Sequence, residues 1–510
     1  MLYYDTFNYT VIMKKPILQI LLSLLPISSF AQYSINWNQD FAGDDREVTD
    51  VRNLNDHQQI VTMNTDYKTF EVFPVDDKLN IPWLTSLEGY ALYSGPFRGH
   101  ILVIANVHIK TLQLGGERGA YIAYLLDAKT GKQELSREVF RQPVSDQEVT
   151  EVYFSPEGSD FKLLVENYRV DKYRIAMVRE TKIIADLSLV SLNEKLEPST
   201  LQLSLPSDNA IQLAFNENGD LFLLTEQQGG FGLVRYEAGQ TKPSAPITQS
   251  LAYRDDFNFP AALIGSDADR KICYFSFAYK NPDKEMALEI GKADFNKQSC
   301  LATAETFDKA AIKNIEKNTP PIDKMLKETT FGWLEGLLPI HLEEYNGGLV
   351  VNIAEKYLKT RATVSTMQTG LNSSTTSYGS SDYGVLSSFI IECFDSQLNR
   401  TFQQALPNFA GMSSSSEPQY IIKDGKLCFD AVTEYKNKAF PLFCELDLKT
   451  GAWVKTDLLL DREDKDYAKY HPLLNGTMWF KDSFAVPYNL EKGGLRFKYT
   501  ESYELQQNNY

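Results

Sequence analysis

The sequence predicts an all-β protein, a β-propeller built from four-stranded blades. Short runs rich in Val, Ile, Phe and Tyr recur along the chain, and Gly, Asn, Asp or Pro bounds them. Aromatic residues make up 12% of the chain, which favours strands over helices. The runs are spaced as units of four strands with loops of uneven length would be. They centre near residues 60, 102, 163, 222, 274, 350, 428 and 479.

Repeated sheet units of this kind expose apolar faces and open edges unless they stack around an axis, where each blade covers its neighbours. The last run lacks room for a complete blade, and the first unit is irregular. The simplest closure lets the C-terminal strands complete a blade begun by the N-terminal segment. That closure gives seven blades, with eight as the alternative. Two consecutive sandwiches are the rival interpretation, but no Pro/Ser-rich linker divides the chain, so we expect one propeller domain over residues 32–510.

Two hairpins far apart in the chain share nearly the same turn. "LLDAKTGKQEL" (125–135) and "ELDLKTGAW" (445–453) resemble the "LDAKTG" hairpin of quinoprotein-like propeller repeats. "VYFSPEGSDFKLLV" (152–165) resembles the "SPDG" turn of TolB-like propeller repeats, and "LAFNENGDLFLL" (213–224) has the same shape. The resemblance implies a bacterial secreted β-propeller. It implies no cofactor, because only the second hairpin has its Trp, Trp453, and five Trp are too few for the Trp-docked blades of a quinoprotein.

The N-terminus predicts an export signal. Over residues 13–31, Lys14 and Lys15 form a positive region, an apolar run follows, and "SFA" precedes a cleavage site after Ala31. The apolar run is about half of the ~20 residues that a spanning helix needs, and a buried core helix is the alternative. Residues 1–12 are then an upstream extension. We expect a soluble exported protein, periplasmic or extracellular, with no membrane insertion after cleavage.

The charge of the chain limits its partners. The formal net charge is −16 and the isoelectric point is near 5.0. Nucleic-acid binding needs a basic face that displaces counterions, so nucleic acid is excluded. An anionic membrane surface is excluded for the same reason. A protein or a glycan remains as the expected partner.

Two segments interrupt the strand pattern. Residues 306–338 contain helix formers split by Pro320 and Pro321, so we expect a helical insertion packed on the propeller, with a partner-binding helix as the alternative. Residues 360–388 are rich in Ser, Thr and Gly and nearly uncharged. They predict a flexible loop between two strands of one blade.

The five cysteines are too few to form a disulfide scaffold. Cys428 and Cys444 nevertheless flank a turn at 435–437 that would place them opposite each other. A disulfide between them and two buried free thiols are both compatible with this pattern. None of the cysteines has the paired spacing of a zinc site.

The sequence contains no motif that assigns a reaction. The chain lacks H-E-x-x-H, G-x-S-x-G and G-x-x-x-x-G-K-[ST], and His100 and His108 would lie too far apart on a strand to share a metal. Acidic runs at 43–47, 266–270 and 461–466 are interrupted by Arg or Lys, which favours solvated turns over Ca²⁺ sites. The remaining histidines are dispersed. They are His57, His341 and His471.

These observations favour an exported, non-catalytic propeller that acts as a binding or interaction module, with no metal, cofactor or catalytic residue assigned. We expect its ligand at the mouth of the central channel or on a loop-rich face. The alternatives are a propeller-fold hydrolase or lyase acting on a polysaccharide, with carboxylates or a Tyr/His set converging on the axis, and an envelope assembly component.

Overall fold

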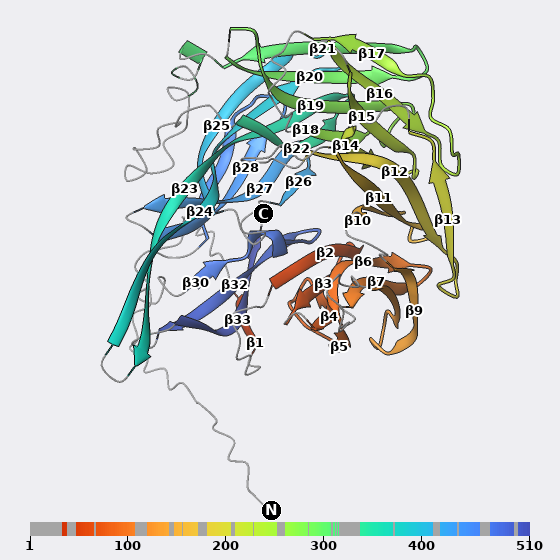
Figure 1. Ribbon diagram of the computed structural model, residues 1–510. Coiled ribbons are helices and arrows are strands. Elements are labelled where there is room, and N and C mark those ends of the chain that lie inside the picture. Colours follow the sequence, from red (N-terminus) through yellow and green to blue (C-terminus); the bar gives the residue numbers. More distant parts are fainter. Residues whose placement is uncertain are drawn as a thin grey trace, which may run out of the picture.

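The computed structural model confirms an all-β propeller and describes most of the chain. The strands within this described part form eight sheets arranged in a ring (Figure 1). The described residues are 33–37, 47–65, 68–107, 120–141, 147–155, 157–171, 181–205, 210–227, 229–251, 261–283, 285–307, 310–311, 313, 315, 337–370, 373–411, 419–435, 438–459, 470–493 and 498–509.

Blades 1 to 4 each consist of four antiparallel strands in chain order. Blade 1 has β2 (Glu47–Asn55), β3 (Gln58–Asn64), β4 (Thr69–Asp76) and β5 (Thr85–Glu88). Blade 2 has β6 (Tyr90–Phe97), β7 (His100–Val107), β8 (Ala120–Asp127) and β9 (Gln133–Arg141). Blade 3 has β10 (Gln147–Phe154), β11 (Phe161–Asp171), β12 (Thr181–Leu192) and β13 (Pro198–Leu203). Blade 4 has β14 (Ala210–Phe215), β15 (Leu221–Gln227), β16 (Gly230–Tyr236) and β17 (Ile247–Ser250).

Blades 5 to 7 repeat this order. Blade 5 has β18 (Ala261–Gly265), β19 (Ile272–Lys280), β20 (Met286–Asp294) and β21 (Ser299–Thr306). Blade 6 has β22 (Leu337–Tyr345), β23 (Gly348–Gly370), β24 (Ser373–Phe394) and β25 (Arg400–Gly411). Blade 7 has β26 (Tyr420–Lys423), β27 (Lys426–Tyr435), β28 (Lys438–Asp447) and β29 (Trp453–Leu458).

Blade 8 joins the two ends of the chain. It contains β30 (Tyr470–Pro472), the 3₁₀ turn η4 (Leu474–Gly476), β31 (Met478–Trp479), β32 (Ser483–Gly493) and β33 (Lys498–Asn509). Its outermost strand is β1 (Tyr33–Trp37), which pairs antiparallel with β33, so that Ile35 lies opposite Leu505. The expectation that an N-terminal segment completes a C-terminal blade is confirmed. The blades number eight because only β1 joins the last sheet, while β2 to β5 form a full blade of their own.

The two faces of the ring carry different kinds of connection. Neighbouring strands in a blade are antiparallel, so strand ends alternate between the faces. The links from first to second strand and from third to fourth strand lie on one face, which we call the turn face. The links from second to third strand and from one blade to the next lie on the opposite face, which we call the connector face. In blades 1 to 7 the first strand lies innermost, toward the centre of the ring (Figure 1).

The two similar hairpins are both third-to-fourth links on the turn face. In the first, the Asp127 carboxylate accepts hydrogen bonds from the amide and hydroxyl of Thr130 at 2.8 and 2.7 Å. Gly131 has a φ of +67° and its carbonyl accepts a hydrogen bond from Thr85 of blade 1 at 2.6 Å. In the second, Gln404 of blade 6 donates to the carbonyl of Gly451 at 2.7 Å. Each turn therefore docks on the last strand of the preceding blade.

Substituting Gly131 tests this docking. A Cβ at Gly131 would overlap the indole of Trp83 in addition to occupying a left-handed backbone conformation. We expect Gly131→Ala to lower the free energy of unfolding by about 2–4 kcal/mol, from left-handed strain and overpacking together. Gly99→Ala is the matched control, because Gly99 has a φ of +80° and no atom within 4 Å of its Cβ position. It should cost only about 1 kcal/mol in chemical denaturation, and equal losses in the two variants would contradict docking.

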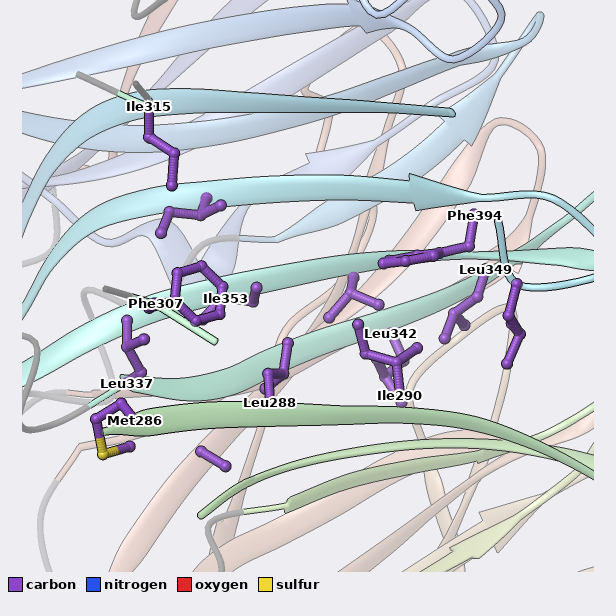
Figure 2. Close-up of a cluster of buried hydrophobic side chains, with 14 of the residues drawn as sticks. Met286, Leu288, Ile290, Phe307, Ile315, Leu337, Leu342, Leu349, Ile353 and Phe394 are labelled. Atoms are coloured by element: carbon purple, nitrogen blue, oxygen red, sulfur yellow. The ribbon is translucent and has the colours of Figure 1, made fainter. Parts of the chain in front are cut away.

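Apolar side chains fill the space between successive blades. Figure 2 shows one such cluster, in which Leu288 and Ile290 of blade 5 face Leu342, Leu349 and Ile353 of blade 6. These five side chains are at most 4% exposed. Each contributes roughly 1.5–3 kcal/mol by leaving water, so stability is distributed around the ring.

The helical insertion lies largely outside the described residues. Its first and last residues belong to β21 and β22, and the described residues Ala310, Ala311, Lys313 and Ile315 are helical. Ile315 is 3% exposed and packs in the cluster of Figure 2. This short segment therefore packs against blades 5 and 6.

The prediction of a loop over residues 360–388 is wrong. Residues 360–370 belong to β23 and residues 373–388 to β24. The two strands form a paired ladder, in which Thr360 lies opposite Asp382 and Ser365 opposite Ser377. Thr and Tyr have good β propensity, and the low charge that suggested a loop is equally compatible with a β-hairpin.

The pairing on which the disulfide hypothesis depended is also wrong. Cys428 lies opposite Glu445, and Cys444 lies opposite Phe429. A register shift of one residue places side chains on opposite faces of a sheet. Cys428 therefore packs toward blade 8 and Cys444 toward blade 6, and both are buried free thiols.

Candidate functional site

The candidate site is a ring of residues on the innermost strands, all at one level. Five of these strands carry a β-bulge close to their first residue, which is the end that lies at the connector face. In blade 8 the same level is interrupted by η4. Bulges bend a strand and re-aim its side chains, and they are common next to binding and catalytic sites. The residues that follow the bulges are Asp50, Tyr93, Glu151, Gln212 and His341.

We call this level the axial ring. Ala262 of blade 5 and Gln419 of blade 7 complete it over seven blades. Behind it, the second strands of blades 1, 5, 6 and 7 place a polar side chain in an otherwise apolar run. All four are 0% exposed, and they are Thr62, Ser276, Asn352 and Asp430.

Asp50 and Arg52 form a charged pair on the blade 1 side of the ring. The carboxylate of Asp50 accepts hydrogen bonds from the amide of Ser94 at 2.7 Å and from Nε of Arg52 at 3.3 Å. Burial raises the pKa of Asp50, although the Arg52 guanidinium acts in the opposite direction. The guanidinium lies 5.3 Å from the ring centroid of Phe154 in blade 3. Phe154 fits there because Gly95 has no side chain, and a Cβ would lie 2.8 Å from the ring.

His341 and Tyr420 form an aromatic pair between blades 6 and 7. Their rings stack with centroids 4.2 Å apart and an interplanar angle of 12°. Nε2 of His341 lies 3.3 Å from a carboxylate oxygen of Glu343. The side-chain amide of Asn352 donates to the hydroxyl of Tyr420 at 2.5 Å. The four groups thus combine an imidazole, a phenol, a carboxylate and a carboxamide.

Asp430 links blades 7 and 8 at the same level. Its carboxylate accepts a hydrogen bond from the amide of Gln419 at 3.0 Å and another from the hydroxyl of Thr477, directly after η4. Within η4, Asn475 donates to the carbonyl of Val48 in blade 1 at 2.6 Å. The 3₁₀ turn therefore connects blade 8 to both of its neighbours.

The axial ring offers hydrogen-bond donors, acceptors and charges of both signs. His341 and Glu343 are partly exposed, with side-chain exposures of 25% and 41%. Among the described residues, buried oxygens of Thr62, Ser276 and Asn352 have no hydrogen-bond partner. Such atoms are rare in folded proteins and gain from a polar group that reaches them. The described residues contain no group of three or more His, Cys, Asp or Glu side chains that could hold a metal ion.

Asp430 makes stability depend on pH. Burial raises the pKa of Asp430 to about 7. The folded protein therefore keeps this proton while the unfolded chain loses it near pH 4, and stability falls as the pH rises from about 4 to about 7. Asp430→Asn removes this ionisation. As the pH rises across this interval, the free energy of unfolding of the variant should increase relative to that of the wild type by on the order of 2–4 kcal/mol. Denaturant unfolding from pH 4 to pH 8 measures this difference.

Asp127→Asn is the control of opposite sign. Hydrogen bonds from Thr130 lower the pKa of Asp127 on the exposed turn. That carboxylate contributes stability that is present above its ordinary pKa and is lost as the pH falls through the lowered pKa of the folded state, so the deficit of this variant should stay nearly constant from about pH 5 to pH 8 and narrow in more acidic solution. A pH-independent difference for Asp430→Asn would contradict the assignment.

The structure separates most residues that the sequence suggested for a site. His57 pairs with Asp77 at 2.7 Å and His100 with Glu134 at 2.9 Å, both on the turn face. Residues 266–270 form the turn between β18 and β19, as expected for a solvated acidic run, except that Ser266 is buried. His471 lies on β30. His108, residues 43–46 and residues 461–466 lie outside the described part.

Of the histidines, the structure places His341 in the axial ring, and no motif around this residue distinguished it from the others. The ring residues Asp50, Tyr93 and Gln212 were missed because the bulges that align them have no sequence signature. The neighbouring second strands did contain a usable signal. It is a single polar residue inside an apolar run, as in "GLVVNIA" and "KLCFDAV".

The fold and the axial ring together define the class of protein: an eight-bladed β-propeller whose innermost strands carry a polar ring. At the level of architecture, this confirms the resemblance to quinoprotein-like and TolB-like propellers. No family model and no curated protein match the sequence. No helix in the described part is long and apolar enough to cross a membrane.

Solved structures resemble the chain in fold alone. BamB from Moraxella catarrhalis is 9% identical, with a TM-score of 0.42 over 94% of this chain and 99% of that one. The Dos1 propeller is 9% identical, with a TM-score of 0.47 over 94% and 95% of the two chains. A polysaccharide lyase described as an ulvan lyase of a new family is 8% identical, with a TM-score of 0.39 over 82% and 91%.

Proposed function

We propose that this protein is an exported, non-catalytic binding module whose protein or glycan ligand contacts the axial ring from the connector face. The observation that carries this proposal is the interruption of the innermost strands at one level, by bulges in five blades and by η4 in blade 8. Regular strands would satisfy the propeller fold equally well, so a shared irregularity beside polar residues favours a binding role.

The ring has the composition of a recognition site. Ligand sites in proteins combine an apolar surround with a few convergent polar groups. Here the clusters between blades supply the apolar surround, and Arg52, His341 and Tyr420 supply a positive charge, an imidazole and an aromatic surface. The ion pairs and stacked rings hold these side chains in place before a ligand arrives, which reduces the entropy cost of binding.

Thermal shift with a defined panel of compounds tests the proposal. The panel contains neutral, uronic-acid and amino-sugar oligosaccharides together with a library of extended peptides. We expect at least one compound to stabilise the protein, and expect Arg52→Gln and His341→Ala to weaken its binding roughly tenfold or more, about 1.4 kcal/mol. Arg141→Gln is the control, because Arg141 is an exposed residue of β9 that pairs with Glu138. A shift that the ring variants leave unchanged, or a panel without any hit, contradicts this location.

A second candidate is a propeller-fold hydrolase or lyase that acts on a polysaccharide. The observation that favours it is the contact of His341 with both Tyr420 and Glu343, since these side-chain types serve in general acid and base catalysis. Cleavage of a uronic-acid polysaccharide, lost in both His341→Ala and Tyr420→Phe, would establish this reaction. Binding without any increase in reducing ends would exclude it for the polysaccharides used.

A further inference from the structure

We propose that the protein forms a homodimer through the free edge of β24, which pairs antiparallel with the same edge of a second copy. The pairing segment is Ser373–Gly384, the part of β24 that extends beyond its blade. We call this extension, together with Lys356–Gly370 of β23, the ribbon. Figure 1 shows the ribbon reaching well past the other strands of blade 6.

The ladder registers show where the ribbon leaves the blade. The first strand of blade 6, β22, pairs with β23 from Gly348 to Glu355. The fourth strand, β25, pairs with β24 from Val385 to Phe394. Beyond these residues β23 and β24 pair with each other as far as Gly370 and Ser373. Within the described residues, therefore, each strand of the ribbon has one edge without a ladder partner.

An unpaired edge is a template for another strand, and proteins usually protect such edges with Lys, Pro or a covering element. Residues 362–381 contain no Asp, Glu, Lys, Arg or Pro. The two edges differ closer to the blade. The ribbon part of β23 contains Lys356, Lys359 and Arg361, whereas that of β24 contains one charge, Asp382. The unprotected edge is therefore the edge of β24.

A second copy fits this edge for reasons of symmetry and charge. Two identical strands related by a two-fold axis pair antiparallel without any complementarity of sequence, because each presents the same backbone groups to the other. The whole chain carries a net charge of −16, and the ribbon contributes no negative excess to it, so two bodies at close range would repel each other. The ribbon spans roughly 45 Å at ~3.3 Å per residue. That length is several times the Debye length of about 8 Å at physiological ionic strength. Salt therefore screens the repulsion between the two bodies when the uncharged ends of their ribbons pair.

The ladder supplies a matched pair of substitutions. Ser365 of β23 and Ser377 of β24 lie directly opposite each other, so they share one level of the ribbon and one face of its sheet. Ser377→Lys places a charge on the proposed dimer edge of each copy, and Ser365→Lys places the same charge on the other edge. Sedimentation velocity of the full chain at micromolar concentrations gives the oligomeric state, and circular dichroism checks the fold of each variant.

We expect the wild type and Ser365→Lys to sediment as dimers and Ser377→Lys to sediment as a monomer. A variant in which Asn-Gly replaces residues 361–381 joins Thr360 to Asp382 through a two-residue hairpin turn and should also be monomeric. A dimer that survives both the shortened ribbon and Ser377→Lys overturns the proposal, as does equal loss of the dimer in the two Lys variants. A monomeric wild type also overturns it, and leaves the edge available to a strand of a different protein.

Discussion

Removing residues 1–38 is expected to destabilise the propeller more than the point substitution at Gly131. The deletion removes β1, the outermost strand of blade 8, and leaves β33 without its partner over the register from Tyr33–Gln507 to Trp37–Tyr503. Each ladder hydrogen bond contributes about 1 kcal/mol net. The free energy of unfolding should fall by on the order of 3–5 kcal/mol, with earlier aggregation on heating because a sheet edge is exposed.

A shorter deletion isolates the effect of β1. Removing residues 1–31 takes away the upstream extension and the expected signal peptide but keeps β1. Its unfolding curve in denaturant should match that of the full chain. If the two deletions unfold alike, the ring does not depend on the N-terminal strand for closure.

Asp220→Asn is expected to have the second large effect, about 3–5 kcal/mol of destabilisation. Asp220 is 0% exposed and accepts hydrogen bonds from Arg235 at 2.8 Å and from Arg270 of blade 5 at 2.9 Å. Replacing the carboxylate leaves the buried guanidinium of Arg235, whose side chain is 8% exposed, without its counter-charge. Breaking a buried ion pair at one partner is costly because it leaves an uncompensated charge.

Arg270→Gln is the matched control, because it removes the exposed partner of the same carboxylate. The Arg270 side chain is 47% exposed, so this substitution should cost only about 0–1 kcal/mol. The effect of Asp220→Asn should also shrink at acidic pH. Burial alone would raise the pKa of Asp220, but the hydrogen bonds from Arg270 and Arg235 outweigh it and lower the pKa overall. The carboxylate thus contributes its stability above its ordinary pKa and loses it in acid. Equal costs in the two variants would contradict the role assigned to burial.

The strands of this fold could be predicted from the sequence because period and turn chemistry are local properties. The apolar runs identified from the sequence correspond to second strands, such as β7, β15 and β27, which have neighbours on both sides and must be apolar on both faces. The blade count was harder to predict, because it depends on how many N-terminal strands join the last sheet and how many form a blade of their own. That choice is a contact between residues near 35 and residues near 505, and nothing in either segment alone determines it.

The axial ring could be predicted only in part, for a related reason. Asn352 and Asp430 are visible as polar residues in apolar strands. Their partners are His341 on β22 and Gln419 directly before β26. A bulge positions the first, and a hydrogen bond to Asp430 positions the second. The ribbon was misjudged because Ser, Thr and Gly are common in loops, and the sequence does not show that two such segments face each other for their whole length.

The pairing of β1 with β33 also determines the order in which the molecule can be assembled. The first strand to be synthesised is among the last to find its partner, because that partner lies at the opposite end of the chain. Contacts between residues so far apart in the sequence form slowly, because closing a very long loop costs entropy before the contact stabilises the chain. Blades 1 to 7 consist of consecutive strands and can form as the chain emerges, whereas blade 8 must wait for the C-terminus. We therefore expect ring closure to be the last step of folding, and a slow phase in refolding kinetics should report it.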